Sequence, residues 1–160
     1  MPSFDITSEF NQQEVINAID QMNREIINRY DFKDTNTSVS FSNDTISLRS
    51  STEERLNAAD QVLREKFAKR NVSIKFLNNF NDEQTPSEAK REYKLKSGLD
   101  KEISKVIVKD LKEFSKKIQS SIQDESIRVS SKKRDELQDA ISFLKKKNYK
   151  VFLNYGNFRD

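Results

Sequence analysis

The sequence predicts an α+β protein in which the element order β-α-β-β-α-β occurs twice. Short segments with alternating apolar residues separate longer segments with helical spacing, and both halves of the 160 residues show these segments in the same order. The simplest fold for this order is ferredoxin-like, with four antiparallel strands that carry two helices on one face. We therefore expect two ferredoxin-like domains related by duplication.

Each element of the first half follows from a local pattern. Phe4 and Ile6 alternate with polar residues, which predicts a strand, and Asn11 with Glu14 can form a capping pair ahead of a helix. In order, we expect a strand at about 3–7, a helix with apolar positions from Val15 to Tyr30, a hairpin over 38–48 that turns at Asn43-Asp44, a helix with apolar positions from Leu56 to Phe67, and a strand over 72–76.

The second half repeats this order after a polar segment that contains Pro86 and shows no periodicity. We therefore expect a first unit over 1–77, a linker over 78–91 and a second unit over 92–160. In order, the second unit is expected to contain a strand at about 92–97, a helix with apolar positions from Leu99 to Phe114, a hairpin over 117–129 that turns near Asp124-Glu125, a helix with apolar positions from Leu137 to Leu144, and a strand over 149–155.

The composition excludes several classes of chemistry. The chain has no His, no Cys and only two Gly residues, which excludes thiolate and His-based catalysis, Cys/His zinc sites, the P-loop and the GxGxxG fingerprint. No apolar run approaches the roughly 20 residues of a membrane span, and the first residues lack the pattern of a secretory signal. We expect a cytoplasmic protein without a cofactor or metal. Carboxylates and lysines could still catalyse a reaction, but nothing in the sequence singles out a pair.

Charge is unevenly distributed along the chain. Residues 1–85 hold 10 Lys and Arg against 14 Asp and Glu, a net charge of −4, whereas residues 86–160 hold 19 against 12, a net charge of +7. A basic half indicates an anionic partner such as RNA, a nucleotide or an acidic protein surface. A lysine-rich solvated surface is the alternative interpretation.

The last predicted helix is expected to open with three cations, Lys132, Lys133 and Arg134. The N-terminus of a helix favours acids in its first turn, as Glu53 and Glu54 provide at the equivalent position of the first half. Two interpretations remain open. The segment is either a solvated basic turn that nearby acids offset, or a phosphate-binding site.

Three further cations occupy the polar sides of predicted strands, namely Arg128, Lys94 and Lys96. In a ferredoxin-like sheet the first and third strands are neighbours, so these side chains share one face if the strands of one half pair with each other. The third strands of both halves lack the aromatic residues of an RNA-recognition motif. Any binding of nucleic acid would therefore depend on charge and shape.

Phe158 and Arg159 near the C-terminus also have two interpretations. Phe158 can attach the tail to the core while Arg159 pairs with Asp160 or another acid. Alternatively, the ring stacks on a base and the guanidinium contacts a phosphate.

Four segments in the same order resemble the YajQ family of bacterial proteins: "MPSFDITSE", "NRYDFKD", "IQDESIRVSSKKRDELQ" and "NFRD". The resemblance implies that the two halves exchange their first strands, so that 3–7 joins the second sheet and 92–97 joins the first. It then places Ser3 and Asp5 near Arg128. It also implies a non-enzymatic protein that binds GTP, tRNA or cyclic-di-GMP and has a regulatory role, with a transcription regulator or other protein as partner.

The resemblance implies further placements and two departures. Lys94 and Lys96 would lie near Ser47 and Arg49. The family usually has Gly where this chain has Asp124 and Ser131. Gly permits backbone conformations and a close ligand approach that other residues resist. These changes therefore count against contact between the backbone and a phosphate more than they count against attraction by the cations.

The candidate ligand-binding residues are cations and one aromatic residue, mostly from the second half. They are Arg128, Lys132, Lys133, Arg134, Lys94, Lys96, Phe158 and Arg159. The favoured hypothesis is a nucleotide- or nucleic-acid-binding protein without a membrane partner. The alternative is a protein-interaction module whose basic second half docks on an acidic partner, and an enzyme that uses carboxylates and lysine is the least favoured.

Overall fold

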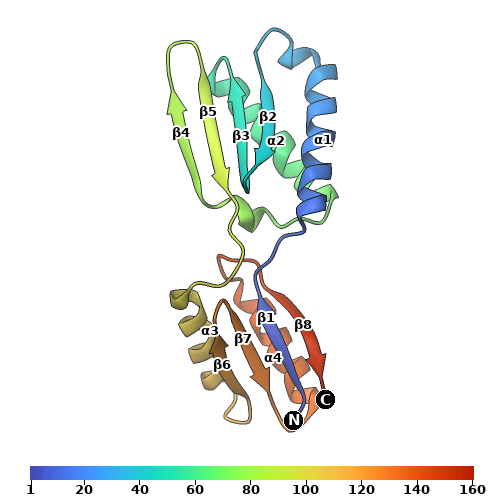
Figure 1. The fold of residues 1–160 in the computed structure, drawn as a ribbon, viewed down its shortest axis with the longest axis vertical. Coiled ribbons are helices and arrows are strands. Elements are labelled where there is room, and N and C mark those ends of the chain that lie inside the picture. Colours follow the sequence, from blue (N-terminus) through green and yellow to red (C-terminus); the bar gives the residue numbers. More distant parts are fainter. The chain divides into compact units, whose positions relative to one another are not determined.

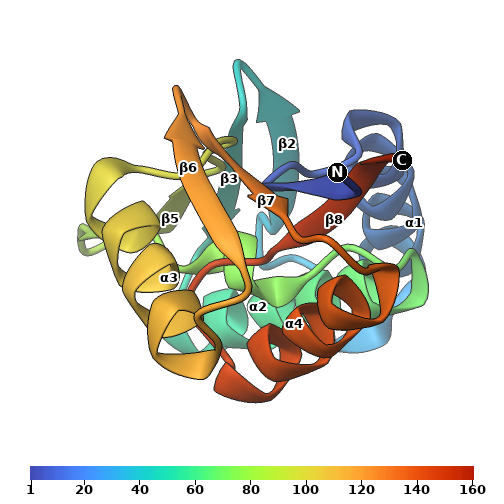
Figure 2. The same cartoon turned by 90° about the horizontal axis from the view of Figure 1, so that it is seen from below.

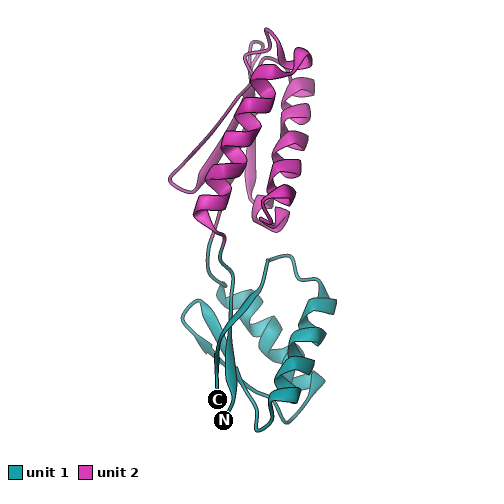
Figure 3. Ribbon diagram, turned by 90° about the vertical axis from the view of Figure 1, so that its right-hand side faces the viewer, with its two compact units in different colours: residues 1–9, 97–160 teal, residues 10–96 magenta.

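Both ends of the chain belong to the same structural unit. The computed structural model describes residues 1–160 and divides into unit 1, residues 1–9 and 97–160, and unit 2, residues 10–96 (Figure 3). Unit 1 is therefore built from two separate segments of the chain, whereas unit 2 is continuous. No helix in either unit is both long enough and apolar enough to cross a membrane.

Unit 1 contains a four-stranded antiparallel sheet in the order β6-β7-β1-β8. Both helices, α3 and α4, cover the same face of this sheet (Figures 1 and 2). The elements are β1 (Ser3–Thr7), α3 (Lys101–Phe114), β6 (Gln119–Gln123), β7 (Ser126–Ser130), α4 (Arg134–Lys147) and β8 (Asn154–Arg159).

The core of unit 1 lies between this sheet and its helices. Phe4 and Ile6 of β1 are fully buried and pair in register with Val129 and Ile127 of β7. The helices add apolar residues to the same cluster, chiefly Ile107, Leu111, Leu137, Ala140, Ile141 and Leu144. The alternation along β1 and β7 therefore has the physical basis predicted from the sequence, with one buried face and one polar face.

Unit 2 has the same arrangement, with sheet order β2-β3-β5-β4 (Figure 1). The elements are α1 (Gln12–Asn28), η1 (Tyr30–Phe32), β2 (Ser38–Ser42), β3 (Thr45–Ser50), α2 (Glu53–Lys69), η2 (Ile74–Leu77), β4 (Phe80–Gln84) and β5 (Ala89–Lys94). The structure thus confirms the predicted α+β fold with two ferredoxin-like domains.

Local interactions fix several element boundaries where the sequence predicted them. The Asn11 side chain accepts a hydrogen bond from Glu14 N at 3.1 Å and caps α1. Asn43 and Asp44 both adopt a left-handed backbone, with φ of 50° and 56°, between β2 and β3. Asn and Asp tolerate this conformation better than other non-glycine residues, which explains the hairpin turn there.

The first strands are exchanged relative to the order of the chain. β1 lies between β7 and β8 in the sheet of unit 1, and β5 lies between β3 and β4 in the sheet of unit 2. The register of β1 opposes Asp5 to Arg128. This is the pairing that the resemblance implied for residues 3–7.

Three predictions about individual segments were wrong. The expected linker over 78–91 contains β4 and the start of β5, joined by a turn in which Thr85 N and Glu88 O lie 2.8 Å apart. The expected strand over 72–76 gives way to the 3₁₀ helix η2. The last strand, β8, begins at Asn154 and not at Tyr149. In each unit the apolar residues after the second helix are packed as a connection, and the strand that follows lies at a sheet edge, where burial imposes less alternation.

Candidate functional site

The turn from β7 into α4 differs from the one predicted. The helix begins at Arg134, and Lys133 is its N-cap residue, with extended backbone and no side-chain capping bond. The first helical turn also contains Asp135 and Glu136, which suit the helix dipole. The prediction that the helix opens with three cations was therefore wrong, because Lys132 and Lys133 precede it as exposed residues.

Ser131, one of the departures from the usual family sequence, is fully buried. Its hydroxyl donates a hydrogen bond to Glu136, and its backbone N–H donates one to Pro2 O at 3.2 Å. Its φ is not positive, so this position does not require glycine. Because the N–H already has a partner inside the protein, it is not available to a phosphate.

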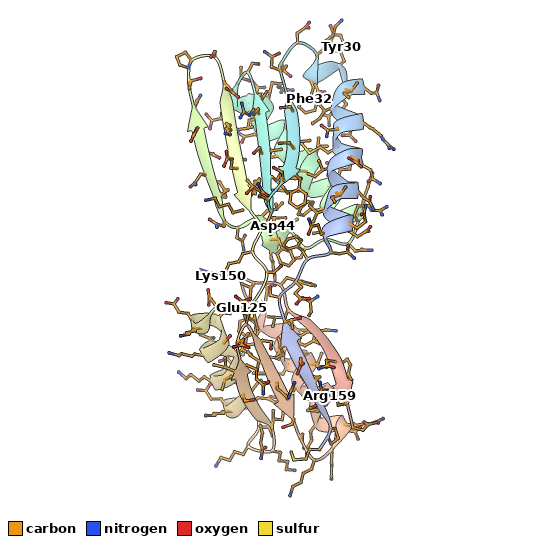
Figure 4. All side chains as sticks on the ribbon, viewed as in Figure 1. Tyr30, Phe32, Asp44, Glu125, Lys150 and Arg159 are labelled. Atoms are coloured by element: carbon orange, nitrogen blue, oxygen red, sulfur yellow. The ribbon has the colours of Figure 1, made fainter.

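A surface pocket of about 290 Å³ lies where α4 begins and where β1 and β8 meet, and Figure 4 labels Arg159 at the end of β8. We call it the α4 pocket. Its lining residues come from both ends of the chain and from one face of α4. They are Pro2, Ser3, Arg134, Leu137, Gln138, Phe158, Arg159 and Asp160.

Two arginines are among the residues that line the α4 pocket. Arg134 forms an ion pair with Asp160, which lowers the pKa of that carboxyl and raises the pKa of Arg134. The expected pairing of Arg159 with Asp160 was wrong, since Asp160 pairs with Arg134. The charge of Arg159 instead contributes to lowering the pKa of Asp5. An incoming anion therefore competes with a carboxylate for Arg134.

Phe158 gives the α4 pocket an accessible aromatic surface. Its side chain is 57% exposed, and its ring packs at a tilt against the buried ring of Phe4, with centroids 5.9 Å apart. Leu137 adds an apolar wall, and the exposed Gln138 adds an amide that can both donate and accept hydrogen bonds. The contact with Phe4 agrees with the interpretation that Phe158 attaches the tail to the core, and stacking on a base stays a prediction.

Arg128 lies outside the α4 pocket, on the face of the sheet that no helix of unit 1 covers. Its Nε donates a hydrogen bond to Asp5 Oδ1 at 3.2 Å, and Asn157 Nδ2 donates one to Asp5 Oδ2 at 2.7 Å. Burial raises the pKa of Asp5, but the hydrogen bonds from Asn157 and Arg128 outweigh it, so the net pKa lies below the ordinary value. Asp5 is therefore ionised at neutral pH.

Lys94 and Lys96 belong to unit 2 and do not line the α4 pocket. Lys94 is opposite Thr45 in the register of β3 and β5, and Lys96 follows the end of β5. The residue opposite Arg49 is Lys90. The expectation that Lys94 and Lys96 lie near Ser47 and Arg49 was thus wrong in register, because β5 begins earlier and ends at Lys94.

The pocket brings together three of the eight candidate residues, namely Arg134, Phe158 and Arg159. Lys132 and Lys133 directly precede Arg134 in the chain but do not line the pocket. Sequence reasoning missed the contributions of Pro2, Ser3 and Gln138. The only available signal for Ser3 was the strand exchange, which brings residues 3–7 into this sheet.

Comparison with known proteins supports the resemblance along the whole chain. Residues 2–159 match the model of the family described as nucleotide-binding protein YajQ-like. The chain belongs to the YajQ family. Similar proteins include one of Trichodesmium erythraeum, 44% identical over 98% of this chain and 97% of its own length, and one of Hahella chejuensis, 38% identical over the full length of both.

A further relative from Nostoc punctiforme is 42% identical over 98% of this chain and 97% of its own length. All three relatives are named nucleotide-binding proteins, and their names specify no enzymatic activity. The match spans both units and therefore includes every residue of the α4 pocket except Asp160. The structure contains no group of three or more carboxylates that could hold a metal ion.

Proposed function

We propose that this chain is a non-enzymatic, cytosolic nucleotide-binding protein and that the α4 pocket holds the nucleotide. The observation that carries this proposal is the presence of two arginines and an exposed aromatic ring in one pocket. Guanidinium groups bind phosphate through paired, charge-assisted hydrogen bonds, and an aromatic face stacks on any base. The names of the three relatives support the same class of ligand.

The proposed roles follow from the geometry. Arg159 and Arg134 contact the phosphates, and Arg134 releases Asp160 as it does so. Phe158 stacks on the base, and Gln138 offers hydrogen bonds to its edge. Lys132 and Lys133 are exposed and directly precede the pocket, so they strengthen the attraction of an anion without contacting it in a fixed geometry.

GTP, cyclic-di-GMP and tRNA are the ligands to compare, since the resemblance to the YajQ family implied these three. A regulatory role, through a transcription regulator or another protein, belongs to the same proposal. Lys94 and Lys96 lie outside the α4 pocket, so the proposal gives them no contact with the nucleotide.

Calorimetric titration with GTP, cyclic-di-GMP and bulk tRNA, each at low and physiological salt, tests the proposal. Wild-type protein is compared with Arg134→Ala/Arg159→Ala and with Lys109→Ala, which removes an exposed cation from α3. We expect saturable binding of one ligand at physiological salt that is lost in the double variant and retained in Lys109→Ala. Absent binding, or equal binding by all three proteins, would contradict the α4 pocket as the site.

A protein-interaction module is the second candidate function, and two exposed apolar side chains favour it. Ile27 and Tyr30 are 81% and 88% exposed in unit 2, and Figure 4 shows Tyr30 beyond the end of α1. Unit 1 separately offers exposed lysines at the end of α4 to an acidic partner. Competition distinguishes the two functions, because a nucleotide site prefers GTP to pyrophosphate and a basic patch does not.

A further inference from the structure

The two sheets have four edge strands, and three of these strands carry a feature that opposes pairing with a further strand. Strand β4 holds Asp82 and Glu83, which are both exposed. The register of β8 shifts against β1, and in β2 the carbonyl of Val39 accepts a hydrogen bond from Asn23 Nδ2 at 3.4 Å. Charges, irregular register and covering groups are common means of protecting an edge. The fourth edge strand, β6, has none of them (Figure 1).

The geometry of the β6–β7 hairpin fixes the direction of each backbone group along β6. The turn at 124–125 has two residues, so Gln123 and Ser126 are the first hydrogen-bonded pair. Such pairs alternate along an antiparallel ladder, and every second residue of β6 therefore directs its N–H and C=O toward β7. The N–H and C=O groups of Ser120 and Ile122 point away from the sheet. They form an unpaired edge.

The charges around β6 change from basic to acidic along the chain. Lys116 and Lys117 precede the strand, its five residues Gln119–Gln123 are uncharged, and Asp124 follows it. All three charged side chains are exposed. A second copy of this segment in antiparallel orientation reverses the order of the charges. The basic end of one copy then meets the acidic turn of the other, so the segment is complementary to itself.

The backbone directions also select a register for this pairing. A two-fold axis at Ser121 places Ser120 opposite Ile122 of the second copy, so that both outward N–H groups and both outward C=O groups of each copy gain partners. Ile122 is 42% exposed in the single chain, and the axis brings the two Ile122 side chains together as diagonal neighbours. In the same register Lys117 lies one position from Asp124 of the second copy. Hydrogen bonds, apolar contact and charge therefore agree on one register.

We propose that β6 pairs in antiparallel orientation with β6 of a second copy of this chain, with the two-fold axis at Ser121. The two sheets then form one continuous sheet in the order β8-β1-β7-β6-β6-β7-β1-β8. No residue of β6 lines the α4 pocket, so the dimer does not depend on the proposed function. One short strand from each copy buries little surface. The dimer is therefore weak and reversible, with a Kd of roughly 10–300 µM.

Opposite charges introduced at Ser121 test both the partner and the register. Ser121→Lys and Ser121→Asp each place two like charges on the axis, so each variant alone should dimerise at least about tenfold more weakly than wild type. An equimolar mixture of the two variants places a cation opposite an anion and should restore the dimer. Ser40→Lys is the matched control, because Ser40 is exposed at the corresponding position of the edge strand β2.

Ser120→Pro gives an independent test that introduces no charge. It removes an outward N–H and leaves the hydrogen bonds between β6 and β7 in place, which is the position at which an edge strand tolerates proline. We expect this variant to remain a monomer. Circular dichroism establishes that each variant is folded.

Sedimentation velocity from about 10 µM to about 1 mM measures the dissociation constants. Amide hydrogen exchange followed by NMR locates the contact. As the concentration of wild-type protein rises, the N–H groups of Ser120 and Ile122 should become protected. Those of Val39 and Phe41 in the β2 edge should exchange at an unchanged rate.

Each result either supports or overturns the inference. It is supported if the dimer is lost in Ser121→Lys, Ser121→Asp and Ser120→Pro, is retained in Ser40→Lys, and returns in the mixture of the two Ser121 variants. A wild-type protein that remains monomeric at about 1 mM overturns it. A dimer that survives all three β6 variants is formed elsewhere and also overturns it. A mixture that stays monomeric overturns the register at Ser121, and growth into larger assemblies overturns the closed two-fold dimer.

Discussion

Arg128 Nε donates a hydrogen bond to Asp5 Oδ1 at 3.2 Å and so joins β7 to a strand 123 residues earlier in the chain. The pKa of Asp5 in the folded protein lies below its ordinary value of 3.8. A group with a lowered pKa contributes stability above its unfolded-state pKa and loses that contribution as the pH falls through the folded-state pKa. The ion pair is partly exposed, so its contribution is about 1 kcal/mol or less.

Asp5→Asn is therefore expected to lower the melting temperature at pH 7, and the difference from wild type should shrink as the pH falls below about 3.8. Differential scanning calorimetry between pH 3 and pH 7 measures both effects. Glu113→Gln, at an exposed position of α3, is the control and should show little change. A difference that grows on acidification would show that Asp5 is not stabilised in its ionised form.

A second prediction concerns Tyr93, which is buried on the exchanged strand β5. Its hydroxyl donates a hydrogen bond to Asp60 of α2 and accepts one from Arg64 Nη2 at 3.3 Å. Burial and the nearby Asp60 carboxylate raise the pKa of Tyr93, so the hydroxyl remains a donor at neutral pH. Tyr93→Phe removes this donor from a buried carboxylate and should destabilise the protein by about 1–2 kcal/mol.

Thermal or urea unfolding of Tyr93→Phe measures this loss. Tyr30→Phe removes the same hydroxyl from a side chain that is almost fully exposed, and should be neutral. If the two variants were equally stable, the bond between Tyr93 and Asp60 would contribute nothing to folding.

The ion pair between Arg134 and Asp160 leads to a third prediction. An anion in the α4 pocket must compete with the Asp160 carboxylate for Arg134. Asp160→Asn removes this competitor and should strengthen the binding of GTP by a factor of about two to five, as expected for an exposed ion pair. Calorimetric titration at physiological salt gives the two affinities. Weaker binding in the variant would indicate that Asp160 itself contacts the ligand.

The hairpin between β6 and β7 leads to a fourth prediction. Asp124 adopts a left-handed backbone with a φ of 54°, where the family usually has Gly. Asp124→Gly should relieve strain and stabilise the protein by up to about 1 kcal/mol. Because the hairpin lies at the opposite end of β7 from Ser131, nucleotide affinity should stay unchanged. Melting temperature and a GTP titration test the two parts, and a change in affinity would place the hairpin in the site.

The sequence was sufficient for elements that depend on local interactions. The cap at Asn11 and the turn at Asn43-Asp44 were predicted because one side chain or one φ angle decides each of them. Strand β4 was not predicted, since all five of its residues are exposed and it shows no alternation of apolar and polar residues. The alternation of Val72, Ile74 and Phe76 just before it predicted a strand instead, but this segment leads into the 3₁₀ helix η2 and Ile74 is exposed.

The sequence also did not indicate which of the candidate residues lie together in the site. Arg134, Phe158 and Arg159 were identified by residue type, but nothing local indicated that they share a pocket with Ser3. That placement depends on the exchange of β1, which came from the family resemblance and not from periodicity. If the strands of each half paired with each other, Lys94 and Arg128 would share one sheet. The exchange places them in different sheets.

The exchange of β1 also makes unit 2 an insertion within unit 1. The chain leaves unit 1 after Glu9 and returns at Ser97, and Gly98 N donates a hydrogen bond to Ser8 O at 2.6 Å. The exit and the return are therefore adjacent, as at the base of an ordinary surface loop. Unit 2 could therefore be deleted by protein engineering. A short turn that joins Glu9 to Ser97 would keep every strand and helix of unit 1 in one small protein.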